Sequence, residues 1–435
     1  MNQQKAIIQI EKLVQGGYGL ARQEGRAIFV RGSIPGEAVE IAIGDTRKQY
    51  QEATVTRVIE SSTERVEPPC PVYGECGGCQ LQHIGYDAQL RLKREMLLET
   101  LARVGKVELP DVPPIVPSPH AYGERSVARF SVVRKGSGLA LGFHRAGSDT
   151  LVPVTDCLLL AEPMRKMVAE LAKRLAAVTK PPCRLESIEL RSSMTLGHVL
   201  LFIRSQARSK RQAEVLFGLC GNIPGLVGCV VTGAPEVRGA RWVQGQDWIA
   251  ERVDDMLVRI GERSFLQSNW AVNRILSEMV VQWSAPQAGL RVLELYAGIG
   301  TLGLPLAKRG AFVTFVEGNA MALSDARRAA NGNHIGRCRF RSVPAERFVA
   351  SLTPGEYDVV LVDPPRTGLS RDLTDGLQAL SAPRILYVSC DAATLARDLA
   401  RLAGHGYRVT RLQAFDMFPQ TAHLETLTEL QCVPR

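Results

Sequence analysis

The sequence contains no run of about 18 consecutive apolar residues, so it offers no candidate for a membrane-spanning helix. Its first residues, MNQQKAIIQIEK, lack the apolar core of a signal peptide, and we therefore expect a cytoplasmic protein without a membrane anchor. It also lacks the biases of disordered, collagen-like or coiled-coil chains, since 45% of its residues are hydrophobic and 22% are charged. A chain of 435 residues with this composition is expected to form about two to four globular domains.

Charge and cysteine content narrow the possible functions. Lys and Arg total 53 against 44 Asp and Glu, and the resulting net charge of +9 favours a polyanionic partner such as a nucleic acid. A basic enzyme without such a partner has the same balance. Ten cysteines in a cytoplasmic chain are not expected to form disulfides. Three of them lie within Cys70–Cys79, and this crowding indicates a chemical role.

Residues 1–60 read as a small β-barrel. Short strand-like runs between residues 5 and 59 alternate with turn signals rich in Gly and Pro. That pattern is typical of an OB-like barrel, a fold that often carries RNA. The basic residues that could contact phosphates here are Arg22, Arg26, Arg31, Arg47, Lys48 and Arg57.

The middle of the chain predicts a second domain interrupted by a helix and a linker. Residues 61–85 hold the crowded cysteines without periodicity, and residues 124–262 mix strand-like runs with a helix at 161–177, which indicates an α+β domain. Between them, residues 86–105 have helical periodicity, and the Pro-rich residues 109–123 predict a linker. We expect residues 86–123 to pack on the C-terminal domain, residues 263–435.

Residues 263–435 alternate apolar strands with helix-like segments, which predicts an α/β fold with a parallel sheet. Strand 291–295 runs into Tyr296-Ala297-Gly298-Ile299-Gly300-Thr301-Leu302-Gly303 and then a helix. Such a loop lets the backbone approach a ligand at the helix N-terminus. Glu317 ends the next strand, where a carboxylate can accept hydrogen bonds from ribose hydroxyls. NAD and S-adenosylmethionine both fit these two features.

A third feature favours S-adenosylmethionine. Asp363-Pro364-Pro365 lies at the C-terminal end of a later strand, where open α/β sheets bind ligands. Two prolines stiffen this loop and remove two N–H donors. Dehydrogenases have no evident need for such a loop, whereas base-modifying methyltransferases often contain one.

A nucleophile and two candidate bases follow. Cys390 ends a further strand at the same predicted edge, and His423 and Glu425 lie in a strand-like segment from Ala422, where we expect them to share a face. A thiolate that adds to carbon 6 of uracil makes carbon 5 nucleophilic, and a base must remove the carbon-5 proton after methylation. Either His423 or Glu425 could be that base. A small buried cysteine and an ordinary half-buried strand are the alternatives.

Several stretches resemble the RNA uracil-5 methyltransferase family across nearly the whole chain. They are FLQSNWAVN, LELYAGIGTLGLPLA, VDPPRTGL, YVSCDAATLARDL, FDMFPQTAHLET and CPVYGECGGCQLQH. The resemblance identifies the barrel as a TRAM domain and the C-terminal region as a Rossmann-like methyltransferase domain. It implies an S-adenosylmethionine-dependent enzyme that methylates carbon 5 of a uridine in structured RNA, with 23S ribosomal RNA expected and the T-loop of transfer RNA as the alternative.

The resemblance also assigns roles to single residues. It implies that Cys390 is the nucleophile and that Glu425 removes the carbon-5 proton, while Arg366 helps to hold the substrate loop. Two departures stand out: Ala297 replaces a common Cys, and Asp391 replaces the usual Asn, which puts fine substrate positioning in doubt. The residues implied to contact S-adenosylmethionine are Gln267, Tyr296, Thr301, Glu317 and Asp363.

The crowded cysteines predict a metal or cluster site. Cys70, Cys76 and Cys79 supply three thiolates on a glycine-rich loop, and a fourth ligand could be His83, which suits zinc, or Cys157, which suits an iron–sulfur cluster. The family pattern implies a [4Fe-4S] cluster held by Cys157 as the fourth ligand. We read the remaining cysteines as structural or incidental: Cys183, Cys220, Cys229, Cys338 and Cys432.

Three competing functions remain open from the sequence. An NAD-linked iron–sulfur oxidoreductase would explain the Gly loop and the cysteines, but neither the Asp-Pro-Pro loop nor the barrel. An RNA-binding module with an inactive methyltransferase domain would not need Cys390 and Glu425 together. A cytosine-5 enzyme typically has Pro-Cys in place of Asp-Pro-Pro. We expect a monomer whose partner is RNA.

Overall fold

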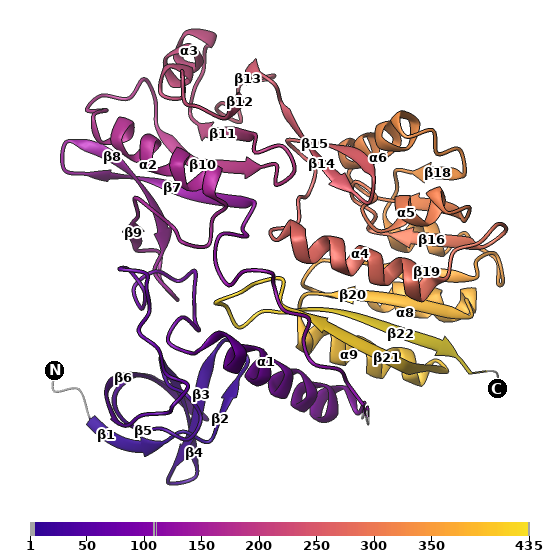
Figure 1. The fold of residues 1–435 in the computed structure, drawn as a ribbon, viewed down its shortest axis with the longest axis horizontal. Helices are drawn as coiled ribbons and strands as arrows, with labels where there is room; N and C mark the ends of the chain where they lie inside the picture. The colour runs from indigo at the N-terminus through magenta and orange to yellow at the C-terminus, as the bar shows by residue number, and fades with distance from the viewer. Residues whose placement is uncertain (1–4, 108, 110, 434–435) are drawn as a thin grey trace.

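The N-terminal strands form one strongly curved sheet. The computed structural model describes residues 5–107, 109 and 111–433, and this sheet lies at the lower left of Figure 1. Its six strands are ordered β1-β5-β6-β4-β3-β2, and alternate apolar side chains such as Ile28, Val30 and Ile41 fill its interior. The strands are β1 Lys5–Gln9, β2 Lys12–Val14, β3 Tyr18–Gln23, β4 Arg26–Arg31, β5 Ala38–Thr46 and β6 Tyr50–Glu60.

A long helix joins this sheet to the rest of the molecule. Helix α1 spans Tyr86–Thr100 and continues as a π-helical turn, η1, over Leu101–Gly105. One stripe of α1, including Leu92 and Met96, packs with Leu13 of the curved sheet. A second stripe, including Leu97, packs into the C-terminal domain. The helix predicted at 86–105 is therefore present, but its last turn is π-helical.

The central part of the chain is built on a seven-stranded sheet ordered β13-β12-β11-β10-β7-β8-β9. Helices α2 and α3 cover one face, where Phe130, Leu190 and Leu201 form the core. The helix expected at 161–177 is observed as α2. The elements are β7 Val127–Lys135, β8 Gly138–His144, β9 Leu151–Pro153, α2 Glu162–Ala176, β10 Leu185–Ser192, β11 Val199–Ser205, α3 Lys210–Gly218, β12 Leu226–Thr232 and β13 Arg241–Gly245.

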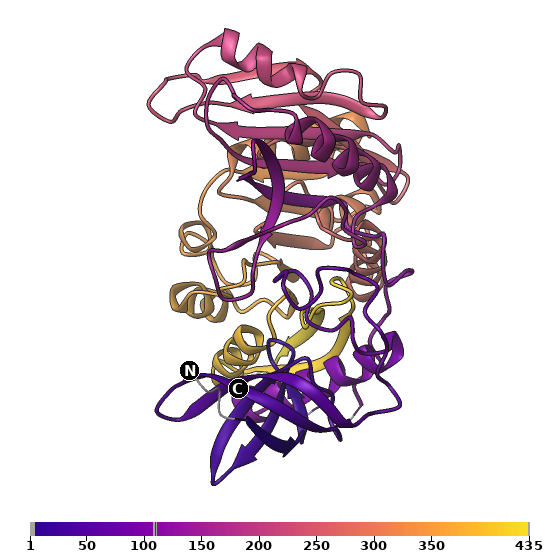
Figure 2. The ribbon, with the colours of Figure 1, turned by 90° about the vertical axis from the view of Figure 1, so that its left-hand side faces the viewer.

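A hairpin connects the central sheet to the C-terminal domain. Strands β14, Trp248–Val253, and β15, Met256–Gly261, pair only with each other among the described strands. Their apolar side chains, including Val253 and Val258, belong to the core of the C-terminal domain. The two domains are thus held together by a shared apolar layer, and Figure 2 shows them stacked above the curved sheet.

The C-terminal domain has the expected α/β architecture. Its sheet is ordered β18-β17-β16-β19-β20-β22-β21, and β22 alone runs antiparallel to both of its neighbours. Apolar helix faces pack on both sides of the sheet. The elements are α4 Trp270–Ser284, β16 Arg291–Leu295, α5 Gly303–Lys308, β17 Phe312–Val316, α6 Ala320–Gly332, β18 Cys338–Arg341, α7 Ala345–Val349, β19 Val359–Val362, α8 Arg371–Leu380, β20 Arg384–Ser389, α9 Ala392–Gly404, β21 Tyr407–Phe415 and β22 Glu425–Cys432.

One sequence expectation about this domain is wrong. Strand β22 begins at Glu425, so His423 lies in the preceding loop and does not share a strand face with Glu425. The side chains of β22 are buried along both faces up to Leu430, because an apolar layer covers each side of the sheet, with Leu427 in one layer and Leu430 in the other. In the described ranges, no helix is both long enough and apolar enough to cross a membrane.

A buried ion pair fastens α1 to the segment before β22. The Nζ atom of Lys93 lies 2.6 Å from Oδ1 of Asp416, and neither side chain is exposed. Lys93 also donates to the Phe418 carbonyl at 3.1 Å, and the Tyr86 hydroxyl donates to Oδ2 of Asp416 at 2.8 Å. Both carboxylate oxygens of Asp416 thus accept a hydrogen bond, and two of the three ammonium N–H groups of Lys93 have an acceptor, which offsets the cost of burying the charges.

We expect the Lys93→Met variant to lose about 3–5 kcal/mol of unfolding free energy, because it leaves Asp416 buried without its cation. The double variant K93M/D416N should lose less than the single one. Denaturant unfolding followed by tryptophan fluorescence measures both. Arg291→Met is the matched control, since it breaks a half-exposed pair with Asp358 and should cost less than about 1 kcal/mol. Equal losses for Lys93→Met and Arg291→Met would contradict the prediction.

Candidate active site

A cavity of about 730 Å³ opens at the C-terminal edge of the parallel strands. Loops that follow β16, β17, β19 and β20 reach it, and β22 enters it with its first residue because this strand runs in the opposite direction. Open α/β sheets bind ligands at this edge. All the site residues predicted for cofactor and catalysis line this one cavity: Gln267, Tyr296, Thr301, Glu317, Asp363, Cys390 and Glu425.

The glycine loop is shaped by backbone conformations that few residues adopt. Tyr296, Gly298 and Gly300 all have positive φ angles, of 59°, 54° and 78°. At Gly303 a Cβ atom would lie 2.1 Å from Oε2 of Glu294, so any side chain there would clash. Ala297 is buried, and its backbone N–H donates to the Val316 carbonyl at 3.1 Å. The Ala at this position therefore takes part in the loop through its backbone.

Glu317 follows the neighbouring strand β17 and accepts a hydrogen bond from the glycine loop. Its Oε2 accepts a hydrogen bond from the Gly298 N–H at 2.9 Å, and its Oε1 accepts one from the Asn319 N–H at 2.7 Å. The carboxylate is therefore fixed at the tip of β17 and lines the cavity. An acid held in this way can accept further hydrogen bonds from a diol.

Two more acids lie beneath the loop. Burial raises the pKa of Asp363 to about 7, although it follows β19 at the cavity edge. Burial, and then the nearby Asp363 carboxyl, also raise the pKa of Glu294. Glu294 lies on β16 and its Oε2 has no hydrogen-bond partner among the described atoms. The region under the glycine loop thus favours protonated carboxyl groups.

Cys390 lies at the end of β20 with a half-buried side chain. Burial, followed by the neighbouring Glu425 carboxyl, raises the pKa of its thiol to about 11. The guanidinium of Arg366 opposes this effect and lowers the pKa of the same thiol. A thiol, a carboxyl and a guanidinium therefore lie close enough to influence one another.

Glu425 and His423 differ as candidate bases. Glu425 is the first residue of β22 and only 3% exposed, and burial raises its pKa well above the ordinary value, with a further increase from Asp363. Burial lowers the pKa of His423, and Arg366 lowers it further, so its ring is neutral at pH 7. Both line the cavity. Only Glu425 is fixed by a strand, since it pairs with Phe415 of β21.

The residue after Cys390 has a structural task. Asp391 is the N-cap of α9, and its Oδ1 accepts hydrogen bonds from the N–H groups of Ala393 at 3.0 Å and Thr394 at 2.8 Å. Asp and Asn are equally good N-caps. The Asp at this position therefore fixes the start of α9, and with it the backbone that carries Cys390.

The crowded cysteines lie beside the same cavity. Cys70, Cys76, Cys79 and Cys157 are all free thiols. Burial raises the pKa of Cys79 to about 12, with Cys157 and Cys76 contributing to this rise, and Cys70 contributes to the raised pKa values of Cys76 and Cys157. The four thiols therefore form one neighbourhood, although no group of three or more Cys, His, Asp or Glu among the described residues is arranged as a metal site.

His83 is engaged elsewhere. Its Nδ1 lies 2.6 Å from the Tyr73 hydroxyl, and its Nε2 lies 3.3 Å from the Ser33 carbonyl. Burial lowers its pKa to about 4. With both ring nitrogens occupied, His83 is poorly suited to the zinc alternative.

Sequence reasoning missed two contributions to the cavity. Gly77, Gly78 and Gln80 of the cysteine loop line it, and so does Arg125. The charge of Arg125 lowers the pKa of Cys76, Cys79 and Cys157. Arg125 is an isolated arginine that belongs to no motif. The backbone N–H of Gln80 reaches the catalytic domain through a bond to the Gln420 carbonyl at 3.0 Å. No local sequence pattern signals a contact of that range.

Comparison with known families agrees with this geometry. Residues 234–432 match the tRNA (Uracil-5-)-methyltransferase family, and residues 4–56 match the TRAM domain. The curved sheet is therefore a TRAM domain, and the C-terminal α/β domain is a methyltransferase domain. The NAD-linked oxidoreductase alternative does not agree with this assignment.

Individual relatives cover almost the whole chain. The 23S rRNA (uracil(1939)-C(5))-methyltransferase RlmD of Pseudomonas entomophila is 35% identical over 97% of this chain and 93% of its own. An uncharacterized RNA methyltransferase of Aquifex aeolicus is 32% identical over 97% of each chain. The tRNA (uracil-54, C5)-methyltransferase of Pyrococcus abyssi, solved with S-adenosyl-L-homocysteine, superposes with a TM-score of 0.74 and 26% identity, over 98% of this chain and 99% of that one. The chain therefore belongs to the family of S-adenosylmethionine-dependent RNA uracil-5-methyltransferases.

Proposed function

We propose that this enzyme methylates carbon 5 of one uridine in 23S ribosomal RNA, with Cys390 as the nucleophile and Glu425 as the base. The observation that carries this proposal is the meeting of the thiol, the carboxyl group and the glycine loop in one cavity. The RlmD relatives, at 35% and 34% identity, support ribosomal RNA as the substrate.

The cofactor residues proposed from the sequence suit S-adenosylmethionine, which supplies an electrophilic methyl group when it is bound. Glu317 offers a fixed carboxylate for the ribose hydroxyls, because two backbone N–H groups already orient it. Tyr296 and Thr301 flank the glycines of the loop. Gln267 lies across the cavity, on the segment that leads from the central domain into α4. Asp363 borders the same space.

Side chains of the protein form the covalent bond to the uracil and remove the proton from its carbon 5. The Cys390 thiolate forms a sulfur–carbon bond to carbon 6 of the uracil, which breaks the π bond between carbons 5 and 6 and makes carbon 5 nucleophilic. After carbon 5 is methylated it carries one extra proton, which the Glu425 carboxylate accepts. The sulfur–carbon bond then breaks and restores the double bond. Arg366 assists both groups, because its charge lowers the pKa of Cys390 and of Glu425.

A transfer RNA substrate is the second candidate, supported by the similarity to the tRNA (uracil-54, C5)-methyltransferase of Pyrococcus abyssi. Unmodified transcripts of 23S rRNA fragments and of transfer RNA distinguish the two. Methyl transfer from radiolabelled S-adenosylmethionine to the ribosomal fragments alone supports our proposal. Transfer to the tRNA alone would replace it with the second candidate.

We expect RNA that contains 5-fluorouridine to trap a covalent complex with the wild-type enzyme and S-adenosylmethionine, because fluorine cannot leave carbon 5 as a proton does. Denaturing electrophoresis detects the complex. Cys390→Ala should form none, whereas Cys432→Ala, a matched control at a cysteine without an assigned role, should form it normally. A complex that persists in Cys390→Ala would exclude Cys390 as the nucleophile.

Glu425→Gln should accumulate the covalent complex on ordinary uridine RNA, since the adduct forms but its carbon-5 proton is not removed. We expect turnover to fall by about two to four orders of magnitude, the usual contribution of a general base. Peptide mapping locates the adduct at Cys390. Wild-type turnover in this variant would exclude Glu425 as the base, and the His423→Gln variant is the matched comparison.

The pH dependence of Cys390 alkylation tests the burial of its thiol. Below the folded pKa of about 11 the reactive thiolate fraction rises about tenfold per pH unit, so iodoacetamide should modify Cys390 about 100-fold faster at pH 9 than at pH 7. Mass spectrometry of the Cys390 peptide follows the rate. In the denatured chain the same rate should level off near the ordinary thiol pKa of about 8.5. A folded-state plateau near pH 8.5 would contradict the prediction.

We further propose that Cys70, Cys76, Cys79 and Cys157 hold a [4Fe-4S] cluster. The four free thiols lie in one neighbourhood, and four thiolates are the usual ligand set of such a cluster. Methyl transfer needs no redox step, so the cluster's role is to hold the cysteine loop in shape beside the cavity.

Protein purified without oxygen should be brown and contain about four iron atoms per chain, as a [4Fe-4S] cluster requires. Cys79→Ser should lose most of the iron and of the visible absorbance, measured by elemental analysis and spectroscopy. Cys183→Ser is the control and should retain both. A colourless, iron-free wild type would rule out the cluster.

A further inference from the structure

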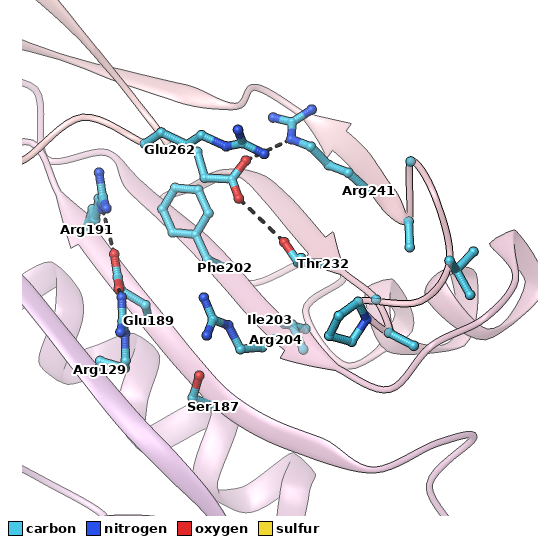
Figure 3. A pocket seen from close by; sticks show the side chains of 17 residues that line it. Arg129, Ser187, Glu189, Arg191, Phe202, Ile203, Arg204, Thr232, Arg241 and Glu262 are labelled. Atoms are coloured by element: carbon cyan, nitrogen blue, oxygen red, sulfur yellow. Dashed lines mark hydrogen bonds and ion pairs between the residues drawn. The ribbon is translucent and has the colours of Figure 1, made fainter. Parts of the chain in front are cut away.

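A second cavity lies on the face of the central sheet that α2 and α3 leave uncovered. It measures about 530 Å³ and is lined by residues of β7, β10, β11, β12 and β13 together with the segment after β15. Along these strands alternate side chains face the helices or the cavity, so Phe130 and Ile188 are core residues while Arg129 and Glu189 face outward. Figure 3 shows this outward set, which we call the central groove.

The central groove is strongly basic. Five arginines against two glutamates give it three net positive charges. One glutamate, Glu189, is shared by Arg129 at 2.6 Å and Arg191 at 2.7 Å. The other, Glu262, binds Arg241 at 2.7 Å. The charged lining residues are Arg129, Glu189, Arg191, Arg204, Arg241, Glu262 and Arg263.

Two of the arginines lack an acidic partner. Arg204 and Arg263 are exposed, and neither forms an ion pair with any described residue. In Figure 3 no dashed line joins the guanidinium of Arg204 to Glu189 or to Glu262. Arginines placed in a groove without partners are available to phosphate oxygens, which they bind through paired N–H donors.

The groove also contains an aromatic surface. Phe202 on β11 is half-buried, and the Arg191 guanidinium lies over its ring, 5.0 Å from the centroid. Arg191 is held there because it donates to the carbonyls of Gly261 at 3.0 Å and Ser264 at 2.7 Å. A fixed guanidinium next to an aromatic ring is a surface on which unpaired bases stack.

The groove begins where the catalytic cavity ends. Val127 lines the catalytic cavity and Arg129, two residues along β7, lines the groove. In the same way Arg263 lines the groove and Phe265 lines the cavity. Two residues along a strand span about 7 Å, so the two spaces adjoin. A polynucleotide that delivers a uridine to Cys390 must continue beyond it, and the groove offers a basic path for that continuation.

From these observations we infer that the central groove binds the single-stranded RNA adjoining the target uridine, with Arg204 and Arg263 on its phosphates. This inference rests on the proposed function, because it identifies where the same RNA continues. Charge complementarity and continuity with the catalytic cavity both favour an RNA strand as the occupant.

The double variant R204A/R263A tests the inference. Its affinity for an unmodified 23S rRNA fragment should fall about tenfold, and the slope of log affinity against log salt should decrease by about two, one for each lost phosphate contact. The rate at saturating RNA and the affinity for S-adenosylmethionine should not change. The matched control K173A/R211A removes two exposed charges from α2 and α3 on the opposite face of the sheet, and should bind RNA as the wild type does. Equal affinities and slopes for the two double variants would overturn the inference.

A second measurement uses the wild-type enzyme, so it does not depend on the folding of a variant. RNA with 4-thiouridine next to the target position should crosslink to peptides that contain Phe202 or Arg241. Crosslinks confined to α2 and α3 would overturn the inference.

The affinity and crosslinking measurements do not depend on turnover, so they test the groove separately from the proposed function. If the wild type methylates neither the 23S rRNA fragments nor the transfer RNA, the proposed function fails, but the binding and crosslinking measurements still test the groove. If it methylates RNA and R204A/R263A matches the control, the groove inference alone fails.

Discussion

The site depends on one constraint of sheet topology, the insertion of an antiparallel strand, β22, beside the parallel strand β20. Parallel strands present their C-terminal ends at one edge, and an antiparallel neighbour presents its N-terminal end at that same edge. Cys390 therefore follows β20 and Glu425 begins β22 at the same place, although 34 residues and a helix separate them in the chain. No flexible loop is needed to bring the thiol and the carboxyl group together.

The contacts that hold this edge of the sheet in place come from distant parts of the chain. Lys93 of α1 holds Asp416, and the backbone N–H groups of Gln80 and Leu81 donate to the Gln420 carbonyl. The segment that leads into Glu425 is thus held by the helix on one side and by the cysteine loop on the other. Burial raises the pKa of Glu425 and Cys390 together, so these supports also maintain the low-polarity setting that the chemistry uses.

Much of this organisation could be predicted from the sequence, because each strand of the C-terminal domain is a short apolar run followed by a residue with its own chemistry. Such local patterns identified the glycine loop, Glu317, Asp363 and Cys390. The strand face proposed for His423 was wrong, because β22 begins only at Glu425 and the alternation in sequence does not show where the strand starts. Arg125 and the central groove could not be predicted either. Their residues are far apart in the sequence, and only the folded chain brings them together to line a cavity.

The position of β22 also has a consequence for how the chain folds during synthesis. It comes after every other strand of its sheet in the chain, yet it lies inside the sheet between β20 and β21, and the partner of Lys93 is 323 residues away. The emerging chain can complete the TRAM sheet early, since that sheet uses only residues 5–60, but the catalytic sheet stays open until β22 has left the ribosome. The cavity is therefore completed after the rest of the sheet, and a chain cut short before residue 425 lacks both Glu425 and the strand that closes the sheet.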